Sequence, residues 1–283
     1  MGREGCSLDA SGSLRPCINP AMANSIITSA REKAGNLWLE YLSRRRKSRI
    51  SRLTDPAIFI HLQPAVQVNC KWYGTSYGGF YIIPSLLNGS SVIYSFGTGR
   101  DISFDTECIR KHGASVFAFD PTPMSIDWIG KQKLPDRFHF HPYGISASVT
   151  GQADFFLPAN PRAISGSLVK HKEVDAAKSV KVMMKTFDDI TRELNHSHID
   201  VLKMDIEGSE YDVIDTILAS QVTVDQILVE FHDRDFEQAE PRSRDAIRKL
   251  SEKGYLVYGC SRSYEEISLI HKSKIKAKMS SYS

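Results

Sequence analysis

Residues 199–210 read IDVLKMDIEGSE, and this stretch decides the fold. Side chains alternate between the two faces of a strand, so Lys203, Asp205 and Glu207 share one face while apolar residues fill the other. A strand at the centre of a parallel sheet is normally apolar on both faces. Charges are costly there unless they are paired or lie where the strand ends. Because Gly208 then breaks the strand, we predict a buried strand with a polar site at its carboxyl end.

Short apolar runs bounded by turn residues alternate with helical patterns on both sides of this stretch. Such alternation indicates βα units and a parallel sheet. The last two runs are close enough in sequence to form an antiparallel pair. We therefore predict an α/β fold with a Rossmann-like, seven-stranded, mostly parallel sheet that ends in a C-terminal antiparallel hairpin. The predicted strands are residues 91–96, 115–119, 138–142, 201–204, 226–231, 255–259 and 266–270.

A second group of polar residues ends the strand that follows. Glu230 and His232 come directly after the apolar run at 226–229. If this strand lies beside the first, Asp205, Glu207, Glu230 and His232 meet at the carboxyl edge of the sheet, where open α/β sheets bind ligands. His232 or a carboxylate would then take a proton from a substrate hydroxyl. Structural ion pairs and acids that suit a helix dipole are the alternative. Oxygen ligands with one imidazole also suit a divalent metal, but we predict none.

A glycine loop, SFGTGRD at residues 95–101, follows the apolar run at 92–94. Glycine lets the backbone turn tightly and approach a ligand, and a helix starting near Ile102 would offer free N–H groups. The pattern alone also fits a plain tight turn. A dinucleotide fingerprint requires a third small residue where this chain has Ile102, which argues against a nicotinamide cofactor.

Acidic Asp120 ends the run at 116–119, about 20 residues beyond the loop, where a carboxylate accepts both hydroxyls of a bound ribose. The alternative is a turn or helix-cap role before Pro121. Tyr143, Gly144 and Ile145 leave the third strand and are candidates to flank an adenine, with a core or turn role equally open.

Five stretches together resemble the FkbM-type S-adenosylmethionine-dependent methyltransferase family, in a eukaryotic methyltransferase-like branch. They are VIYSFGTGRD at 92–101, VFAFDPTP at 116–123, VKVMMKTFDDI at 180–190, IDVLKMDIEGSEYDVI at 199–214 and ILVEFH at 227–232. The resemblance implies a class I methyltransferase fold, S-adenosylmethionine as methyl donor, and transfer to oxygen of a sugar-like or other hydroxyl. It also places the small-residue loop at 165–168 near the substrate.

The resemblance extends to individual residues. It implies catalytic roles for Asp205 and Glu207, to which we add His232 and Glu230. Ser95 and Asp101 depart from the usual methyltransferase loop, and Asp101 could supply the negative charge that the methionine ammonium requires. A catalytically inactive, cofactor- or partner-binding module and a nicotinamide oxidoreductase remain the alternatives. The predicted cofactor-binding residues are Ser95, Phe96, Gly97, Thr98, Gly99, Asp101, Asp120, Tyr143, Gly144, Ile145 and Asp205.

The remaining chain suggests how the protein is organised. We predict a disordered N-terminus at 1–20, a helical extension and lead-in segment at 21–80, the methyltransferase domain at 81–272 and a basic tail at 273–283. Basic runs at 44–49 and in the tail could meet an anionic surface, although a solvated helix end and a solvated tail are the simpler explanations. The net charge of +3 is too small to indicate a nucleic-acid partner, so the expected partner is a small-molecule or glycan-like substrate.

The five cysteines are scattered and form no C-x-x-C pair, which argues against a zinc knuckle or a disulfide framework. We find no signal peptide and no run of about 18 apolar residues, so we predict no transmembrane segment and a cytoplasmic location.

Overall fold

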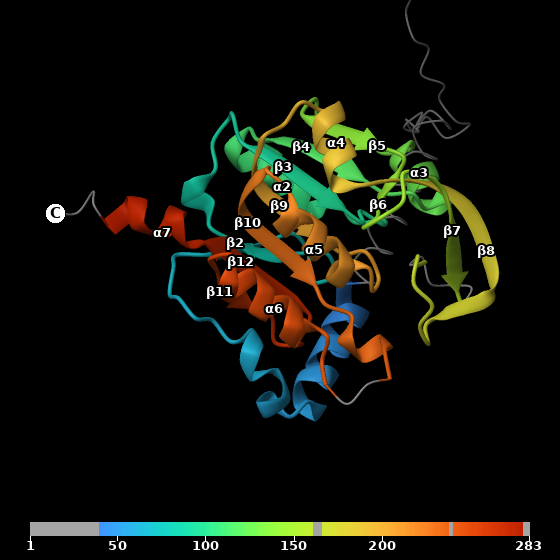
Figure 1. Ribbon diagram of the computed structural model, residues 1–283, viewed down its shortest axis with the longest axis horizontal. Helices are drawn as coiled ribbons and strands as arrows, with labels where there is room; N and C mark the ends of the chain where they lie inside the picture. Colours follow the sequence, from blue (N-terminus) through green and yellow to red (C-terminus); the bar gives the residue numbers. More distant parts are fainter. Residues whose placement is uncertain (1–39, 161–165, 238–239, 280–283) are drawn as a thin grey trace, which may run out of the picture. The chain divides into compact units, whose positions relative to one another are not determined.

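The computed structural model describes residues 40–160, 166–237 and 240–279 (Figure 1). The chain divides into two compact units, residues 1–45 and 46–283. In the first unit, the described residues 40–45 are helical, and Arg44 pairs with Glu40 one turn earlier at 2.6 Å. The predicted disordered N-terminus at 1–20 and residues 21–39 of the predicted helical extension lie outside the described residues.

The second unit is built on a seven-stranded sheet in the order β11-β12-β10-β9-β3-β4-β5. The five strands from β10 to β5 run parallel, β12 pairs antiparallel with β10, and β11 pairs antiparallel with β12. The prediction of a mixed α/β fold around a central sheet is thereby confirmed. The strands are β3 (Val92–Phe96), β4 (Ser115–Phe119), β5 (Phe138–His141), β9 (His198–Met204), β10 (Thr223–Glu230), β11 (Tyr255–Cys260) and β12 (Glu266–His271).

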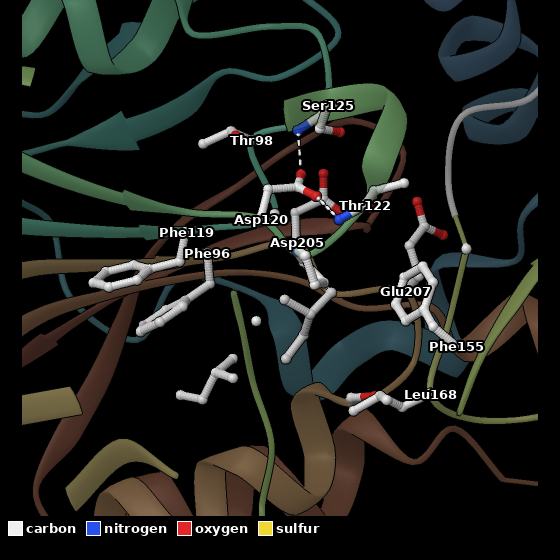
Figure 2. A pocket seen from close by; sticks show the side chains of 18 of the residues that line it. Phe96, Thr98, Phe119, Asp120, Thr122, Ser125, Phe155, Leu168, Asp205 and Glu207 are labelled. Carbon is white, nitrogen blue, oxygen red and sulfur yellow. Dashed lines mark hydrogen bonds between the residues drawn. The ribbon is translucent and has the colours of Figure 1, made fainter. Parts of the chain in front are cut away.

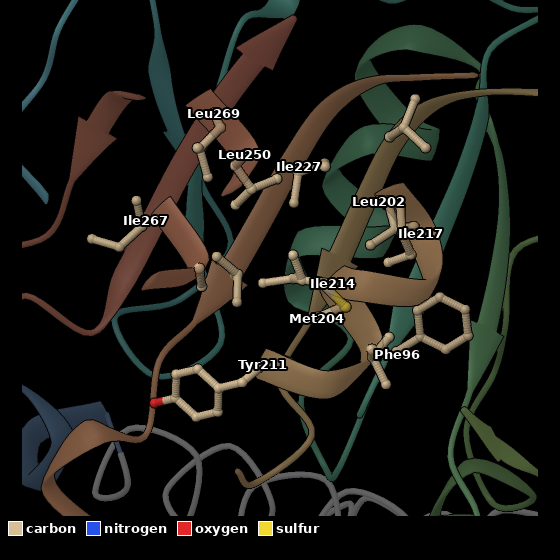
Figure 3. Close-up of a cluster of buried hydrophobic side chains, with 14 of the residues drawn as sticks. Phe96, Leu202, Met204, Tyr211, Ile214, Ile217, Ile227, Leu250, Ile267 and Leu269 are labelled. Carbon is tan, nitrogen blue, oxygen red and sulfur yellow. The ribbon is translucent and has the colours of Figure 1, made fainter. Parts of the chain in front are cut away.

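Three helices cover one face of this sheet: α4 (Phe187–Glu193), α5 (Glu210–Ala219) and α6 (Ser243–Glu252) (Figure 1). Their apolar faces and the sheet form one buried cluster. Figure 3 shows Ile214 and Ile217 of α5 among Leu202 and Met204 of β9 and Ile227 of β10. The buried apolar alternation of β9 and β10 therefore anchors α5 directly behind the carboxyl ends of both strands.

The other face is covered by α2 (Ser103–His112), α3 (Pro123–Ile129) and the antiparallel pair β1 (Lys71–Tyr73) and β2 (Phe80–Ile82). Buried Gln226 of β10 ties this pair to the sheet, because its Oε1 accepts hydrogen bonds from the Ile83 N–H at 2.9 Å and the Tyr258 hydroxyl at 2.9 Å. Residues 46–80 thus belong to the same compact unit as the sheet.

A separate three-stranded sheet, in the order β6-β8-β7, extends from one edge of the domain (Figure 1). It consists of β6 (Gly144–Ile145), β7 (Gly151–Pro158) and β8 (Val174–Lys185). β7 and β8 form an antiparallel pair, and β8 runs parallel to β6. This sheet brings apolar side chains toward the end of the central sheet where the polar residues gather.

The other elements are short. Residues 46–53 are helical, and three 3-10 helices follow at η1 (Pro56–Leu62), η2 (Pro84–Leu86) and η3 (Asp233–Asp235). Helix α7 (Lys272–Met279) occupies the start of the predicted basic tail. No helix in the described part of the chain has the length and apolar character needed to cross a bilayer.

Candidate active site

The glycine loop lies between the carboxyl ends of β4 and β9. Gly97 has a φ of 75°, and its N–H donates to the Phe119 carbonyl at 2.9 Å. A Cβ on Gly97 would lie 1.7 Å from the backbone oxygen of Asp205. Gly99 has a φ of 53°, and its N–H donates to Asp120 Oδ2 at 2.8 Å. Both positions require glycine for their backbone conformation, and Gly97 also requires it for lack of space.

Asp120 is buried and holds two backbone segments together (Figure 2). Its Oδ2 accepts from Gly99, and its Oδ1 accepts from the Thr122 N–H at 2.8 Å. Burial raises the pKa of this carboxyl above its ordinary value. The turn role considered from the sequence is therefore observed. Each oxygen has a second lone pair, so the same carboxylate retains capacity to accept a ligand hydroxyl.

A pocket with about 770 Å³ of empty space, counted to its open mouth, lies beside this loop. Figure 2 shows Asp120, Thr122 and Asp205 on one side of it, with Phe155, Glu207 and Leu168 across from them. Ten of the predicted site residues line the pocket: Phe96, Gly97, Thr98, Gly99, Asp101, Asp120, Gly144, Ile145, Asp205 and Glu207.

Four predicted residues do not line it. Ser95 is fully buried in β3. Tyr143 is buried with its hydroxyl 3.4 Å from Glu193 Oε1 and with Lys185 Nζ 4.1 Å above its ring, so its polar end is engaged elsewhere. Glu230 and His232 lie behind the lining residues Asp205 and Glu207 rather than among them.

Asp101, predicted to face a cofactor ammonium, is held by protein groups on both oxygens. Its Oδ1 accepts from the Ser103 N–H at 2.8 Å at the start of α2, and its Oδ2 accepts from the Thr75 hydroxyl. Asp101 therefore joins the loop between β1 and β2 to the glycine loop. The loop between β1 and β2 contributes Tyr77 and Gly78 to the pocket.

The predicted meeting of polar residues at the ends of β9 and β10 is present. His232 Nδ1 donates to Glu210 Oε1 at 3.0 Å, while Nε2 lies 3.3 Å from Glu207 Oε2 and 3.7 Å from Asp205 Oδ1. Burial opposes a charge on His232, but Glu210 and Glu207 raise its pKa well above the usual range. Burial, together with the neighbouring Asp205, raises the pKa of Glu230 well above its usual range.

Glu210 fixes the turn that leads from β9 into α5. Its side chain is buried, with Oε1 accepting from the Ile206 N–H at 2.9 Å and Oε2 from the Gly208 N–H at 3.0 Å. Burial opposes ionisation, but the neighbouring His232 holds the pKa of Glu210 below its ordinary value. The turn also places Glu207 at a φ of 52°, a left-handed conformation that is uncommon outside glycine.

Lys203, a charged residue of β9, is buried beside the glycine loop. Its Nζ lies 3.5 Å from the Gly97 carbonyl oxygen and 5.5 Å from the Phe80 ring centre. Asp105 of α2 is buried nearby, and burial raises its pKa although Lys203 opposes the rise. Lys203 forms no ion pair with an acid among the described residues, so the structural alternative of an ion-paired lysine is not observed here.

Several lining residues were not predicted. Phe155 and Met184 come from β7 and β8, and Ser125 comes from α3. Nothing in their local sequence marks them, because they reach the pocket only through tertiary packing. The loop expected near the substrate does contribute, with Gly166 and Leu168 in the lining and Ser167 Oγ donating to the Glu207 carbonyl at 2.6 Å. Ser165 lies outside the described residues.

Comparison with known proteins places this geometry among methyltransferases. The family model of the Methyltransferase FkbM domain matches residues 93–257. The chain is also 28% identical over 127 residues to the hexuronic acid methyltransferase AglP of Haloferax volcanii. That alignment covers 44% of this chain and 50% of the relative, so the chain spans about half the length of the curated relative that it matches.

More distant likenesses were found among solved structures. Fibrillarin of Aeropyrum pernix, solved with natively bound S-adenosyl-L-methionine, aligns with a TM-score of 0.36 at 8% identity over 65% of this chain and 66% of that one. An rRNA methylase from Streptococcus thermophilus aligns with a TM-score of 0.34 at 8% identity over 66% of this chain and 88% of that one. We draw nothing about the site from likenesses this distant.

Proposed function

The chain belongs to the FkbM methyltransferase family, and from that membership we propose that it methylates an oxygen of a hydroxyl-bearing, sugar-like acceptor. Residues 93–257 form a methyltransferase domain whose cofactor is S-adenosylmethionine. The observation that carries the proposal is the pocket at the carboxyl edge of the sheet, where the glycine loop, Asp120 and the acidic end of β9 meet. The acceptor and the roles of individual residues are the proposed part.

The pocket fits the cofactor by its own residues. The backbone at Gly99 has open space on the side where a side chain would lie, since a Cβ there would meet nothing within 4 Å. Thr98 Oγ1 is buried and has no hydrogen-bond partner among the described residues, so a ligand group would satisfy it. Ser95 and Tyr143 are left out of the proposed set because neither lines the pocket. We assign cofactor contacts to Phe96, Gly97, Thr98, Gly99, Asp101, Asp120, Gly144, Ile145 and Asp205.

Within that set the roles follow from side-chain chemistry. Asp120 is the candidate for ribose, because its carboxylate oxygens can accept from two adjacent hydroxyls. Gly144 and Ile145 of β6 are the candidates to flank the adenine. The cofactor supplies a methyl group on a positively charged sulfur, and the acidic lining at Asp205 and Glu207 favours positive charge nearby.

An acceptor hydroxyl becomes a better nucleophile as its proton is removed. Asp205 and Glu207 are the carboxylates that can receive this proton and hold the hydroxyl, with His232 and Glu230 completing the polar group behind them. Asp205 and Glu207 line the same pocket as the proposed cofactor contacts, and His232 and Glu230 lie behind them. The match to a hexuronic acid methyltransferase supports a sugar-like acceptor, because a hexuronic acid carries several hydroxyls.

The test is methyl transfer by the whole chain from isotope-labelled S-adenosylmethionine to a panel of hexoses, hexuronic acids and their glycosides. We expect labelled product from at least one acceptor, with the label on oxygen by mass spectrometry. Asp205→Asn and Glu207→Gln should each lower the rate, by about 10²-fold or more for a group that moves the proton. The control is Asp127→Asn, on an exposed side chain of α3, which should leave the rate unchanged.

Binding of S-adenosylmethionine without product from any hydroxyl acceptor would contradict the proposal. That outcome would favour the cofactor- or partner-binding module. Label on nitrogen or carbon would overturn the assignment to oxygen while keeping the methyltransferase.

A further inference from the structure

His232 has a different environment on each of its two ring nitrogens. On one side, Nδ1 donates its hydrogen bond to buried Glu210 at 3.0 Å. On the other side, Nε2 faces Glu207 Oε2 at 3.3 Å and Asp205 Oδ1 at 3.7 Å. One nitrogen is thus committed to a protein acceptor, and the other points at two carboxylates.

Glu210 gives the ring a fixed orientation. Its carboxylate is itself held by two backbone N–H groups, those of Ile206 and Gly208. A histidine that binds a metal through one nitrogen usually donates its other N–H to such a carboxylate, which fixes the tautomer and the ring direction. A cation that displaces the proton from His232 Nε2 would meet a lone pair that points toward Asp205 and Glu207.

The spacing of the three atoms suits a cation between them. Metal–ligand bonds of about 2.1 Å put neighbouring ligand atoms about 3.0–3.4 Å apart. The Nε2 to Glu207 distance of 3.3 Å lies in that range, and rotation of the Asp205 carboxylate would shorten its distance of 3.7 Å. Ligand atoms of all three residues lie within 4.8 Å of one another.

Both carboxylates line the pocket, and the side chains of Asp205 and Glu207 are 25% and 24% exposed. Ser167 Oγ donates to the Glu207 carbonyl at 2.6 Å and so holds the backbone that carries this side chain. A separate observation indicates a missing polar ligand: Ser209 Oγ lines the same pocket, is buried, and has no hydrogen-bond partner among the described residues. A hydrated cation would bring water molecules that such a hydroxyl can bind.

The charges at this site also favour a cation. Asp205, Glu207, Glu210 and Glu230 are four carboxyls around a single imidazole. A divalent cation would offset two of these charges.

We propose that Asp205, Glu207 and His232 bind one divalent first-row metal ion, with Glu210 orienting the imidazole. Two carboxylates and an imidazole suit Mn²⁺ and similar ions better than Mg²⁺, which prefers oxygen ligands alone. This site departs from our expectation of no metal. The ion would hold the acceptor hydroxyl oxygen beside the methyl donor, a role that rests on the proposed function, whereas binding of the ion does not.

The test uses the whole chain, freed of metal by a chelator and titrated with Mn²⁺ alone, with free Mn²⁺ read by electron paramagnetic resonance. We expect one tight Mn²⁺ per chain. Asp205→Asn and His232→Ala should abolish it, and Glu210→Gln should weaken it about 10- to 100-fold. Circular dichroism would establish that each variant is folded, and Glu207→Gln provides a further variant at a part-exposed side chain.

A matched control lies at the opposite edge of the sheet. His198, Asp200 and Asp225 form another cluster of possible ligands, but Asp200 accepts from Ser91 and Val92, and Asp225 pairs with His198 and Lys274. His198→Ala should therefore leave Mn²⁺ binding unchanged.

Absence of tight Mn²⁺ binding by the native chain would overturn the site, as would native-like binding by folded Asp205→Asn and Glu207→Gln. The two proposals fail separately. Full methyl transfer by the metal-free chain would overturn the ion's role in the reaction and keep the proposed activity. Tight Mn²⁺ binding without methyl transfer would keep the metal site and contradict the proposed activity.

Discussion

Gly97 lies directly against the backbone of Asp205, so close that a Cβ on the glycine would sit 1.7 Å from the Asp205 carbonyl oxygen. The glycine loop and the acidic end of β9 are therefore built as one structure. The Asp205 N–H completes this contact by donating to the Phe96 carbonyl at 3.1 Å. A change in the loop should reach Asp205, one of the carboxylates proposed as catalytic, through backbone atoms, without any intervening side chain.

Replacing Gly97 by alanine should be far more harmful than the same change at Gly99. Both residues have positive φ, which costs an L-residue about 1–2 kcal/mol. At Gly97 the added methyl also meets a backbone oxygen that cannot rotate away, whereas at Gly99 it meets nothing within 4 Å. Urea unfolding should show a loss of about 1–2 kcal/mol for Gly99→Ala and a clearly larger loss for Gly97→Ala. Equal losses would show that the contact with Asp205 is not held in solution.

Glu210 should contribute to stability as well as to the site. Glu210→Ala removes the buried acceptor of two backbone N–H groups and leaves His232 without its partner, which should cost about 3–5 kcal/mol. Asp212, two residues later on α5, has a side chain 63% exposed, and Asp212→Ala should change the unfolding free energy by no more than about 0.5 kcal/mol. A loss below about 1 kcal/mol for Glu210→Ala would contradict the buried network.

Asp105 should make the folded state less stable as the pH rises. Burial raises the pKa of Asp105 above its ordinary value, so the folded state holds the proton more tightly than the unfolded state. The contribution of this group is then fully present below the unfolded pKa and is lost as the pH rises toward the folded pKa. Neighbouring Lys203 and Asp101 act on the same carboxyl in opposite directions.

Asp105→Asn cannot titrate, so its unfolding free energy should fall less steeply than that of the native chain from about pH 4 to about pH 8. Urea titrations across that range would show it, with Asp127→Asn as the exposed control on α3. Parallel curves for the native chain and Asp105→Asn would contradict the buried, proton-holding carboxyl.

The meeting of Asp205, Glu207 and His232 could be predicted from the sequence, because parallel strands bring their carboxyl ends to one edge of a sheet. The strands themselves carry clear apolar runs that stay buried, as in β9 and β10. The orientation of His232 could not be predicted. It depends on the left-handed turn at Glu207, which brings Glu210 back under the ring where the sequence suggests only a helix-start acid.

The apolar wall of the pocket could not be predicted either. β8 is exposed over much of its length, so its apolar periodicity is too weak to reveal which residues turn inward. Phe155 and Met184 reach the pocket because β7 and β8 pair and continue beside β6. Tyr77 and Gly78 do so because Thr75 and Asp101 tie the β1–β2 loop to the glycine loop.

Ligand-induced stabilisation of the whole chain tests the central claim most directly. The melting of the protein is compared in the presence of S-adenosylmethionine, S-adenosylhomocysteine and NAD⁺. We predict stabilisation by the first two and none by NAD⁺; for a dissociation constant of about 1 μM and a 100-fold excess of ligand, the gain is roughly 2.7 kcal/mol. Stabilisation by NAD⁺ alone, or by none of the three, would contradict the assignment of this pocket to a methyl donor.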